Sequence, residues 1–277
     1  MGSSSQTASG GGYPSERSDF PFFFGLFLIS SVYVFLIVAM LLADASFTTP
    51  GDLLAAIDKP EIRYAIKLSL LSCSLTTILS LWVAVPVGYL LSRVDFRGKN
   101  LLDSILDIPI VLPPLVLGLS LLILFQTPPG RWFEENVISV TYAVPSVILS
   151  QFMVACAFAV RTMRATFEQI DPRREQVALT LGCSRSQAFC LVVLPEAKRG
   201  VLTAATLAWA RALGEFGPVL IFSGATRMKT EVLPTTVFLE LSVGNIEGAV
   251  AVSLLMVAAA LVVLVIVRVF GQEENVR

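Results

Sequence analysis

Long apolar runs dominate the hydrophobic pattern of this chain. Lipid offers the backbone no hydrogen-bond partner, so a segment that crosses the hydrocarbon layer forms a helix of about 20 apolar residues. Six stretches meet this requirement, and five of them carry at most one charged residue. They are residues 20–43, 68–91, 108–126, 139–160, 200–222 and 246–267. We therefore predict an all-α, polytopic membrane protein with six transmembrane helices.

The two ends of the chain differ from these apolar runs. Residues 1–19 are rich in Ser and Gly and are expected to form a disordered leader. The stretch 20–43 is expected to remain as a first membrane span, because its apolar core is too long for a signal peptide. Residues 269–277 are expected to form a short tail, too short for a regulatory domain.

Composition supports a membrane protein and argues against several other classes. Hydrophobic residues make up 55% of the chain and charged residues 15%, whereas soluble domains carry about 25% charged residues. The mean hydropathy is +0.77. A net charge of -1 gives no basic excess to suggest nucleic acid as a partner. There is no histidine, and the four cysteines form no CxxC pair, so we expect no metal site and no catalytic residues.

The positions of Lys and Arg predict the orientation in the membrane. If the N-terminus is inside, the inner segments hold thirteen of the 20 basic residues and the outer segments five. We therefore expect both termini in the cytoplasm, with the longest cytoplasmic segment at residues 161–199. The expected location is the plasma (inner) membrane.

The 161–199 segment begins with signals for a short helix. Asp171 can cap free N–H groups, and Pro172 fits the first helical turn. The run that follows ends at Gly182, a residue that readily adopts the left-handed conformation found at helix ends. We predict a first short helix that ends at Leu181.

A second short helix is expected directly after Gly182. Ser184 and Gln187 have the spacing of a capping box. Pro195 is expected to end this helix. From the residues alone, an amphipathic loop on the membrane surface remains an alternative.

The spacing in this segment resembles the EAA loop of permeases from binding-protein-dependent ABC importers. The family pattern is Glu-Ala-Ala, three residues, Gly, nine residues, an aliphatic residue, one residue, and Leu-Pro. The matching positions are Gln176, Val177, Ala178, Gly182, Val192, Leu194 and Pro195. Two of them depart from the pattern, because Gln176 replaces Glu and Val177 replaces Ala. Glu175 lies one residue early for the family's acidic contact.

Three further segments are similar to the permeases of molybdate, tungstate and sulfate importers. They are "FRGKNLLDSILDIPIVLPPLVLGLSLL", "AFAVRTMRATFEQIDP" and "LAWARALGEFGPVLIFSG". The resemblance covers about residues 64–268. The stretch "ARALGEFGPVLIFSG", with the short segment 230–234 after it, is most similar to the molybdate/tungstate type, and sulfate remains the alternative.

This resemblance implies a fold and a set of partners. The fold is the type I ABC importer permease (MetI-like) fold, with a five-helix core at residues 64–268 and a first span that packs on a second permease copy. The implied partners are ABC ATPase subunits, an extracytoplasmic substrate-binding protein and membrane lipid. ATP and Mg²⁺ would bind the ATPase, since the chain has no GxxxxGK[ST] loop and binds no cofactor itself. The transport mechanism would be alternating access, without an enzymatic reaction.

The resemblance also assigns roles to single residues. The residues expected to couple the chain to the ATPase are Glu175, Gln176, Ala178, Gly182, Leu194 and Pro195. The candidates for the translocation pathway are Arg211, Gly214, Glu215, Pro113, Pro114, Gly118 and Thr76.

The pathway candidates have open alternatives. Arg211 and Glu215 are spaced i,i+4 within a span. Arg211 either attracts a divalent oxyanion, or the two charges neutralise each other and fix helix packing. Thr76 either faces the pore or bonds its own backbone. Pro113 and Pro114 should bend the third span, either along the pathway or at a packing contact.

Three rival classes fit less well. A secondary transporter would need internal repeats and ion-coupling carboxylates within the membrane, but we find no repeat and Glu215 has Arg211 beside it. A membrane enzyme is disfavoured because the chain lacks histidine and any acid/base constellation. A scaffold protein would not explain the EAA-like loop.

Overall fold

The computed structural model describes residues 20–272 and divides the chain into two units, one ending at Ser46 and one starting at Phe47. The described part of the first unit belongs to a single helix, α1 (Phe20–Phe47). Its 28 residues give a length of about 42 Å, enough to cross the membrane. A helix therefore forms over the whole of the first predicted span, 20–43, and ends four residues later.

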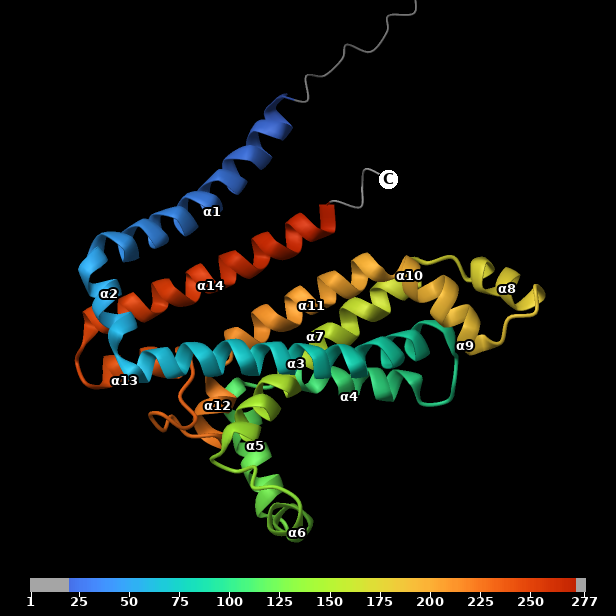
Figure 1. The fold of residues 1–277 in the computed structure, drawn as a ribbon. Coiled ribbons are helices and arrows are strands. Elements are labelled where there is room, and N and C mark those ends of the chain that lie inside the picture. The colour runs from blue at the N-terminus through green and yellow to red at the C-terminus, as the bar shows by residue number, and fades with distance from the viewer. Residues whose placement is uncertain (1–19, 273–277) are drawn as a thin grey trace, which may run out of the picture. The chain divides into compact units, whose positions relative to one another are not determined.

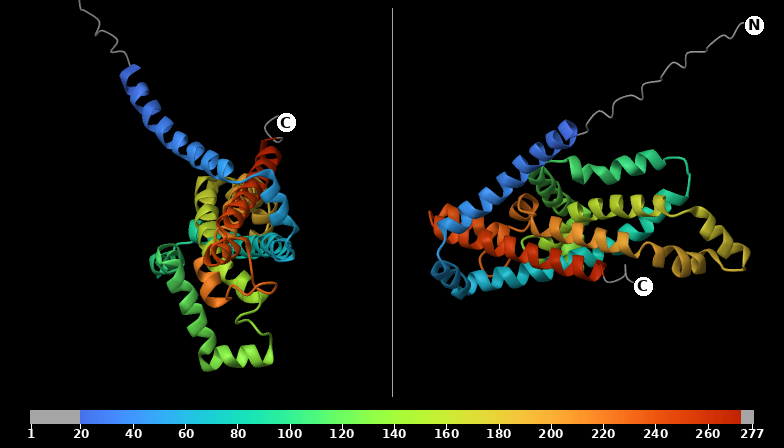
Figure 2. Two further views of the ribbon diagram at one scale, coloured as in Figure 1. Left: turned by 90° about the vertical axis from the view of Figure 1, so that its left-hand side faces the viewer. Right: turned by 90° about the horizontal axis from the view of Figure 1, so that it is seen from above.

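The described part of the second unit is helical throughout, with short connections (Figures 1 and 2). Its helices are α2 (Pro50–Asp58), α3 (Pro60–Arg93), α4 (Lys99–Val111), α5 (Pro114–Gln126), α6 (Pro128–Asn136), α7 (Val144–Gln169), α8 (Pro172–Thr180), α9 (Arg185–Ala188), the π-helix η1 (Phe189–Val193), α10 (Leu194–Glu196), α11 (Lys198–Leu213), α12 (Gly217–Phe222), α13 (Leu233–Ser242) and α14 (Ile246–Gln272).

The core of this unit is a bundle of α3, α7 and α11, with α14 packed on α11 and α13 (Figure 1). Small residues on α3 let α7 approach closely, as is typical of helix pairs in membranes. A Cβ at Gly88 would lie 2.8 Å from the backbone nitrogen of Arg164. Met163 and Phe167 of α7 are fully buried in the same core. Close packing along α3 and α7 therefore fixes the end of the bundle that carries α8 and α9.

An ionic cluster joins three segments at the opposite end of the bundle. Glu240 of α13 is 2% exposed and lies 3.5 Å from the Lys59 ammonium and 2.9 Å from the Arg227 guanidinium. Asn245 also donates a hydrogen bond to this carboxylate. Burial alone would raise the pKa of Glu240, but the hydrogen bond from Asn245 and the two positive charges lower it below its usual value.

The third predicted span, 108–126, is wrong as a single helix. The helix is interrupted between α4 and α5, and the axes of these two helices make an angle of 111°. Pro113 has extended backbone angles there (φ −54°, ψ 133°), because a proline disfavours helical geometry in the residue before it, and Pro114 follows. The bend expected at the two prolines is confirmed.

The fifth predicted span, 200–222, is also interrupted. α11 ends at Leu213, and α12 begins only at Gly217. Pro218 lacks the N–H that would bond the Gly214 carbonyl in a continuous helix. The 16 residues of α11 span about 24 Å. Among residues 20–272, four continuous helices are long and apolar enough to cross a membrane, or five if α4 and α5 count as one span. The predicted number of six continuous helices is thus not reproduced.

The two broken segments pack against each other. A Cβ at Gly118 of α5 would lie 2.8 Å from the Pro218 Cα, and a Cβ at Gly217 would lie 2.8 Å from the Pro114 Cβ. Only glycines permit this approach of α5 and α12. The sharp bend at the prolines is therefore stabilised by a tertiary contact.

The fourth predicted span, 139–160, is displaced along the chain. α7 begins at Val144, where Pro145 is tolerated in the first turn, and continues to Gln169. Residues 161–169, which we expected in the cytoplasmic segment, are helical because Met163 and Phe167 belong to the buried core. The second and sixth predicted spans, 68–91 and 246–267, lie within the longer helices α3 and α14.

Candidate functional site

The short helices after α7 form where the sequence predicts them. The Asp171 carboxylate accepts a hydrogen bond from the backbone N–H of Arg173 at 2.9 Å, which caps α8. Gly182 ends this helix with φ +94°, the left-handed conformation expected there. Ser184 and Gln187 form the predicted capping box at the start of α9.

The prediction that Pro195 ends the second helix is wrong. The chain passes from α9 through η1 into α10, and Pro195 lies inside α10. In the π-helix, the Leu194 N–H bonds the carbonyl of Phe189, five residues back. Pro195 has no N–H to donate to a regular helical turn. Because the wider π-helical turn accommodates it, the chain continues almost directly into α11.

The expected coupling residues lie on the loop made by α8, α9 and η1 and on α10, which follows it, and they differ in exposure. Gln176, Gly182 and Pro195 are exposed, Leu194 is half-buried and Ala178 is buried. At Gly182 no atom lies within 4 Å of the position that a Cβ would occupy. The exposed glycine therefore marks an open part of the surface.

Glu175 points into the protein. Its carboxylate accepts a short hydrogen bond from the Tyr89 hydroxyl and lies 3.6 Å from Arg93 Nε. The Arg93 guanidinium also donates to the Ile170 carbonyl at 2.8 Å. The Tyr89 ring packs on Phe189 of η1, with 4.6 Å between the ring centroids. Glu175 therefore connects α8 to the end of α3, and its role in coupling stays a prediction.

Three large apolar side chains on the same loop face outward. Val177 is 57% exposed, Leu191 69% and Leu181 80%. We call these three residues the apolar loop surface. Val177 occupies the second position of the EAA pattern, where the family has Ala.

A cavity of about 1040 Å³ opens between α4, α7 and α11. It extends from Phe158 and Leu207, within the bundle, to Glu196 and Arg199, near the α8 end. Its wall carries both acidic and basic side chains. The charged residues that line it are Asp103, Asp107, Arg161, Arg164, Glu168, Glu196 and Arg199.

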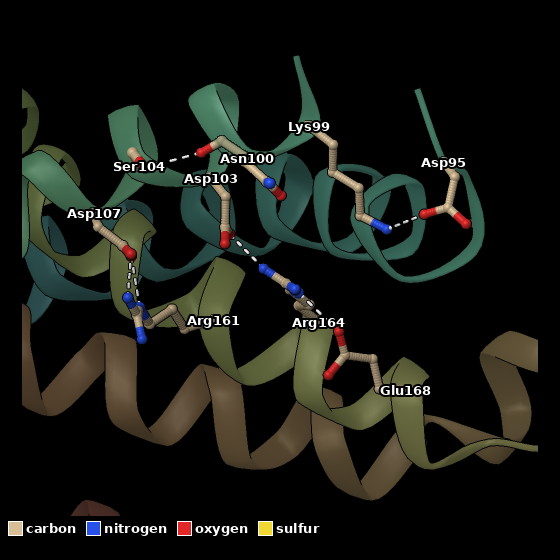
Figure 3. A network of polar contacts seen from close by, with 9 residues as sticks. All are labelled: Asp95, Lys99, Asn100, Asp103, Ser104, Asp107, Arg161, Arg164 and Glu168. Carbon is tan, nitrogen blue, oxygen red and sulfur yellow. Dashed lines mark hydrogen bonds and ion pairs between the residues drawn. The ribbon is translucent and has the colours of Figure 1, made fainter. Parts of the chain in front are cut away.

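Ion pairs connect α4 to α7 along this cavity (Figure 3). The Arg161 guanidinium forms a two-point contact with the Asp107 carboxylate, with Nε 2.5 Å from Oδ1. Arg164 binds both Asp103 and Glu168. Asp103 and Asp107 of α4 thus both pair with arginines of α7.

Arg211 and Glu215 form the ion pair that their spacing suggests. Arg211 Nη2 lies 3.1 Å from Glu215 Oε1, and the two side chains are 43% and 4% exposed. The Arg211 guanidinium carbon lies 4.7 Å from the centroid of the Phe158 ring. Gly214, between the two charges, is exposed at the end of α11. The structure thus supports the pairing, and the anion contact stays a prediction.

The other pathway candidates lie at packing contacts or at the bend. Thr76 is buried, with its hydroxyl 3.3 Å from the Gln151 side chain and from the Ile148 carbonyl of α7. Pro113 and Pro114 are exposed at the bend, and Gly118 is buried against α12. Their part in a pathway stays a prediction.

The sequence reasoning missed the charged wall of the cavity. It placed Arg161 and Arg164 in a loop, although they lie three residues apart on one face of α7. Asp103 and Asp107 have the matching i,i+4 spacing on α4. This matching spacing of basic and acidic residues was the signal in the sequence from which the ion pairs could have been predicted. Among residues 20–272, no three His, Cys, Asp or Glu side chains come together as a metal site would require.

Comparisons with known proteins agree with this architecture. Residues 84–273 match the family described as "Binding-protein-dependent transport system inner membrane component". The sulfate transport system permease protein CysT of Escherichia coli (strain K12) is 34% identical over 210 residues, which cover 75% of this chain and 76% of that protein. The molybdate/tungstate transport system permease protein WtpB of Pyrococcus abyssi (strain GE5 / Orsay) is 35% identical over 201 residues, covering 71% and 77%.

A solved structure shares the fold. A crystal structure of a bacterial alginate ABC transporter, in complex with an alginate pentasaccharide-bound periplasmic protein, contains a chain with a TM-score of 0.72 to this one. The match covers 93% of this chain and 96% of the other, at 16% identity. At that identity the comparison concerns the fold alone.

Proposed function

This chain belongs to the family of binding-protein-dependent transport system inner membrane components, and from that premise we propose that it is the permease of an ATP-driven oxyanion importer. The observation that carries the substrate class is that similar relatives transport sulfate or molybdate/tungstate according to their names. All three are divalent tetrahedral oxyanions. We propose molybdate or tungstate as the substrate, with sulfate as the alternative.

The ATPase is proposed to dock on the loop made by α8, α9 and η1. The apolar loop surface (Val177, Leu181 and Leu191) supports this, because a loop that exposes several large apolar side chains is typical of a protein contact site. The sequence has no phosphate-binding loop of its own, so ATP and Mg²⁺ would bind the partner. Glu175 would transmit motion of α8 to α3 through Tyr89 and Arg93.

The transport path is proposed to run through the cavity between α4, α7 and α11. The cavity extends to the end of the bundle that carries α8, which supports an inward-open state with that end in the cytoplasm. Two copies of the chain would face each other across the path, with α1 of each packed on the other copy. An external binding protein would deliver the anion at the opposite end. Both termini would then lie in the cytoplasm.

Reconstitution in lipid vesicles tests the substrate. The chain is combined with its ATPase and its binding protein, and uptake of labelled molybdate and sulfate is measured with ATP. We expect molybdate uptake that excess tungstate inhibits and that sulfate inhibits only weakly. Uptake of sulfate alone would replace the molybdate proposal by the sulfate alternative. Uptake of neither anion, with a complex that hydrolyses ATP, would contradict the oxyanion proposal.

A further inference from the structure

Two arginines lie near one aromatic ring, Phe158, at the end of the cavity that is within the bundle. The Arg211 guanidinium stacks on the Phe158 ring at 4.7 Å. Phe158 and Arg161 are three residues apart on α7, so they share a face, and both line the cavity. Leu207, one turn before Arg211 on α11, lines the same cavity. An anion that passes Phe158 from the side of Arg211 would therefore next meet Arg161.

The arginines of this region differ in how their charges are satisfied. Arg211 and Arg161 each pair with a single carboxylate, Glu215 and Asp107 respectively. Arg164 instead lies between two carboxylates (Figure 3). The Arg161 side chain is 62% exposed, whereas that of Arg164 is 30% exposed. Each guanidinium uses two of its nitrogens in these pairs, but the charge of Arg161 is opposed by one carboxylate and its side chain is the more exposed of the two at the cavity wall.

We infer that Arg161 is a second anion contact on the translocation pathway, which receives the oxyanion beyond Phe158 by exchanging its ion pair with Asp107. This inference rests on the proposed function. A guanidinium presents paired N–H groups that fit either a carboxylate or two oxygens of a tetrahedral oxyanion. The exchange therefore replaces one two-point contact by another of the same geometry. No covalent bond changes in this step.

The carboxylate beside Arg161 explains how such a contact releases its anion. A transport site must bind its ion well enough to admit it and weakly enough to let it leave. Once displaced, the Asp107 carboxylate stays next to the oxyanion and repels it. Arg161 lies eight residues before the end of α7, about 12 Å along the helix. The released anion then has a short distance to travel to the α8 end.

A structural role is the competing explanation for the same ion pair. No residue of α4 is buried in the bundle, so Asp107 and Arg161 also hold α4 against α7. A tether and an anion contact predict different effects of removing the carboxylate. Without Asp107, an anion contact loses its competitor and binds more tightly, whereas a tether loosens in the same way as when Arg161 is removed.

The test uses the full complex of chain, ATPase and binding protein in vesicles, with labelled molybdate as the probe. R161Q should lower uptake roughly tenfold or more, because a charge-assisted contact is lost. R161K keeps a positive charge for Asp107 but lacks the paired N–H groups of a guanidinium. It should assemble normally, with several-fold lower uptake. R63Q is the matched control, because Arg63 is also an exposed arginine paired with one carboxylate, Asp58, but does not line the cavity, and it should keep uptake within about twofold of wild type.

Direct binding separates the two explanations. Molybdate binding is measured on the nucleotide-free complex of chain and ATPase. D107N should bind several-fold more tightly than wild type, and R161Q should bind several-fold more weakly. Weaker molybdate binding in both variants would overturn the inference in favour of a tether. Uptake by R161K at the wild-type rate would overturn it as well. If the wild-type complex transports no oxyanion, the proposed function itself fails, and that outcome is distinct from the failure of Arg161.

Discussion

Gly182 offers a sharp test of the proposed ATPase contact on the loop made by α8, α9 and η1, because the chain contains a matched glycine outside that loop. Gly182 has φ +94° and Gly98, in the turn before α4, has φ +95°. At both glycines, the position that a Cβ would occupy has no atom within 4 Å. A methyl group therefore meets no clash within the chain at either site. Each Gly→Ala substitution costs only the left-handed conformation, about 1 kcal/mol.

The two variants should consequently have equal abundance and equal thermal stability. They should differ in docking, since the proposed ATPase surface includes Gly182 but not Gly98. Overpacking of one methyl group in a close contact costs about 1–3 kcal/mol, so G182A should weaken ATPase docking roughly tenfold and lower uptake accordingly. G98A should leave both unchanged.

The assay is co-purification of each variant with the ATPase at graded ATPase concentrations, followed by uptake in vesicles. Equal docking and equal uptake by G182A and G98A would refute the proposed contact at Gly182. An equal loss in both variants would also refute it, because the effect would then follow from the backbone cost alone.

Three further experiments probe other parts of the structure. E175Q weakens the link from α8 to Arg93, so uptake should fall while the complex keeps its ATPase activity; loss of both together would contradict a coupling role. In the exchange R211E/E215R, recovery of assembly lost in the single variants would support a structural pair, and normal uptake by the double variant would exclude an essential anion contact at Arg211. E240Q should lower stability by about 1–3 kcal/mol, measured by thermal unfolding in detergent. Because the pKa of Glu240 is lowered in the folded state, its stabilisation is full above the ordinary glutamate pKa and is lost as the pH falls through the lowered value. Acid should therefore reduce the stability difference between E240Q and wild type, and an unchanged difference at low pH would contradict this assignment.

Local signals allowed the start of each short helix after α7, and the end of the first, to be predicted from the sequence. Asp171, Gly182 and Ser184 act on their own helix ends, through hydrogen bonds and backbone conformation within a few residues. Such features depend only on the residues at that point of the chain, so they can be predicted from the local sequence. Pro195 misled the prediction because η1, a rare π-helix turn upstream, accommodates it.

Tertiary packing decided the features that the sequence did not reveal. Hydropathy alone does not distinguish one straight span from two helices that meet at 111°. The break after α4 persists because Gly118 and Gly217 let α5 and α12 interlock. The length of α7 depends on Phe167, which is buried by α3 and its neighbours. The charged wall of the cavity became apparent only when Arg161 was placed on a helix opposite Asp107.

Accumulation of the anion against its gradient tests the central claim most directly. Vesicles that contain the chain, its ATPase and its binding protein are loaded with ATP on the side that carries the α8 loop. The account predicts that labelled molybdate accumulates on that side only when ATP and both partner proteins are present. Accumulation without the ATPase, or ATP hydrolysis that the anion-loaded binding protein stimulates without any anion uptake, would contradict it.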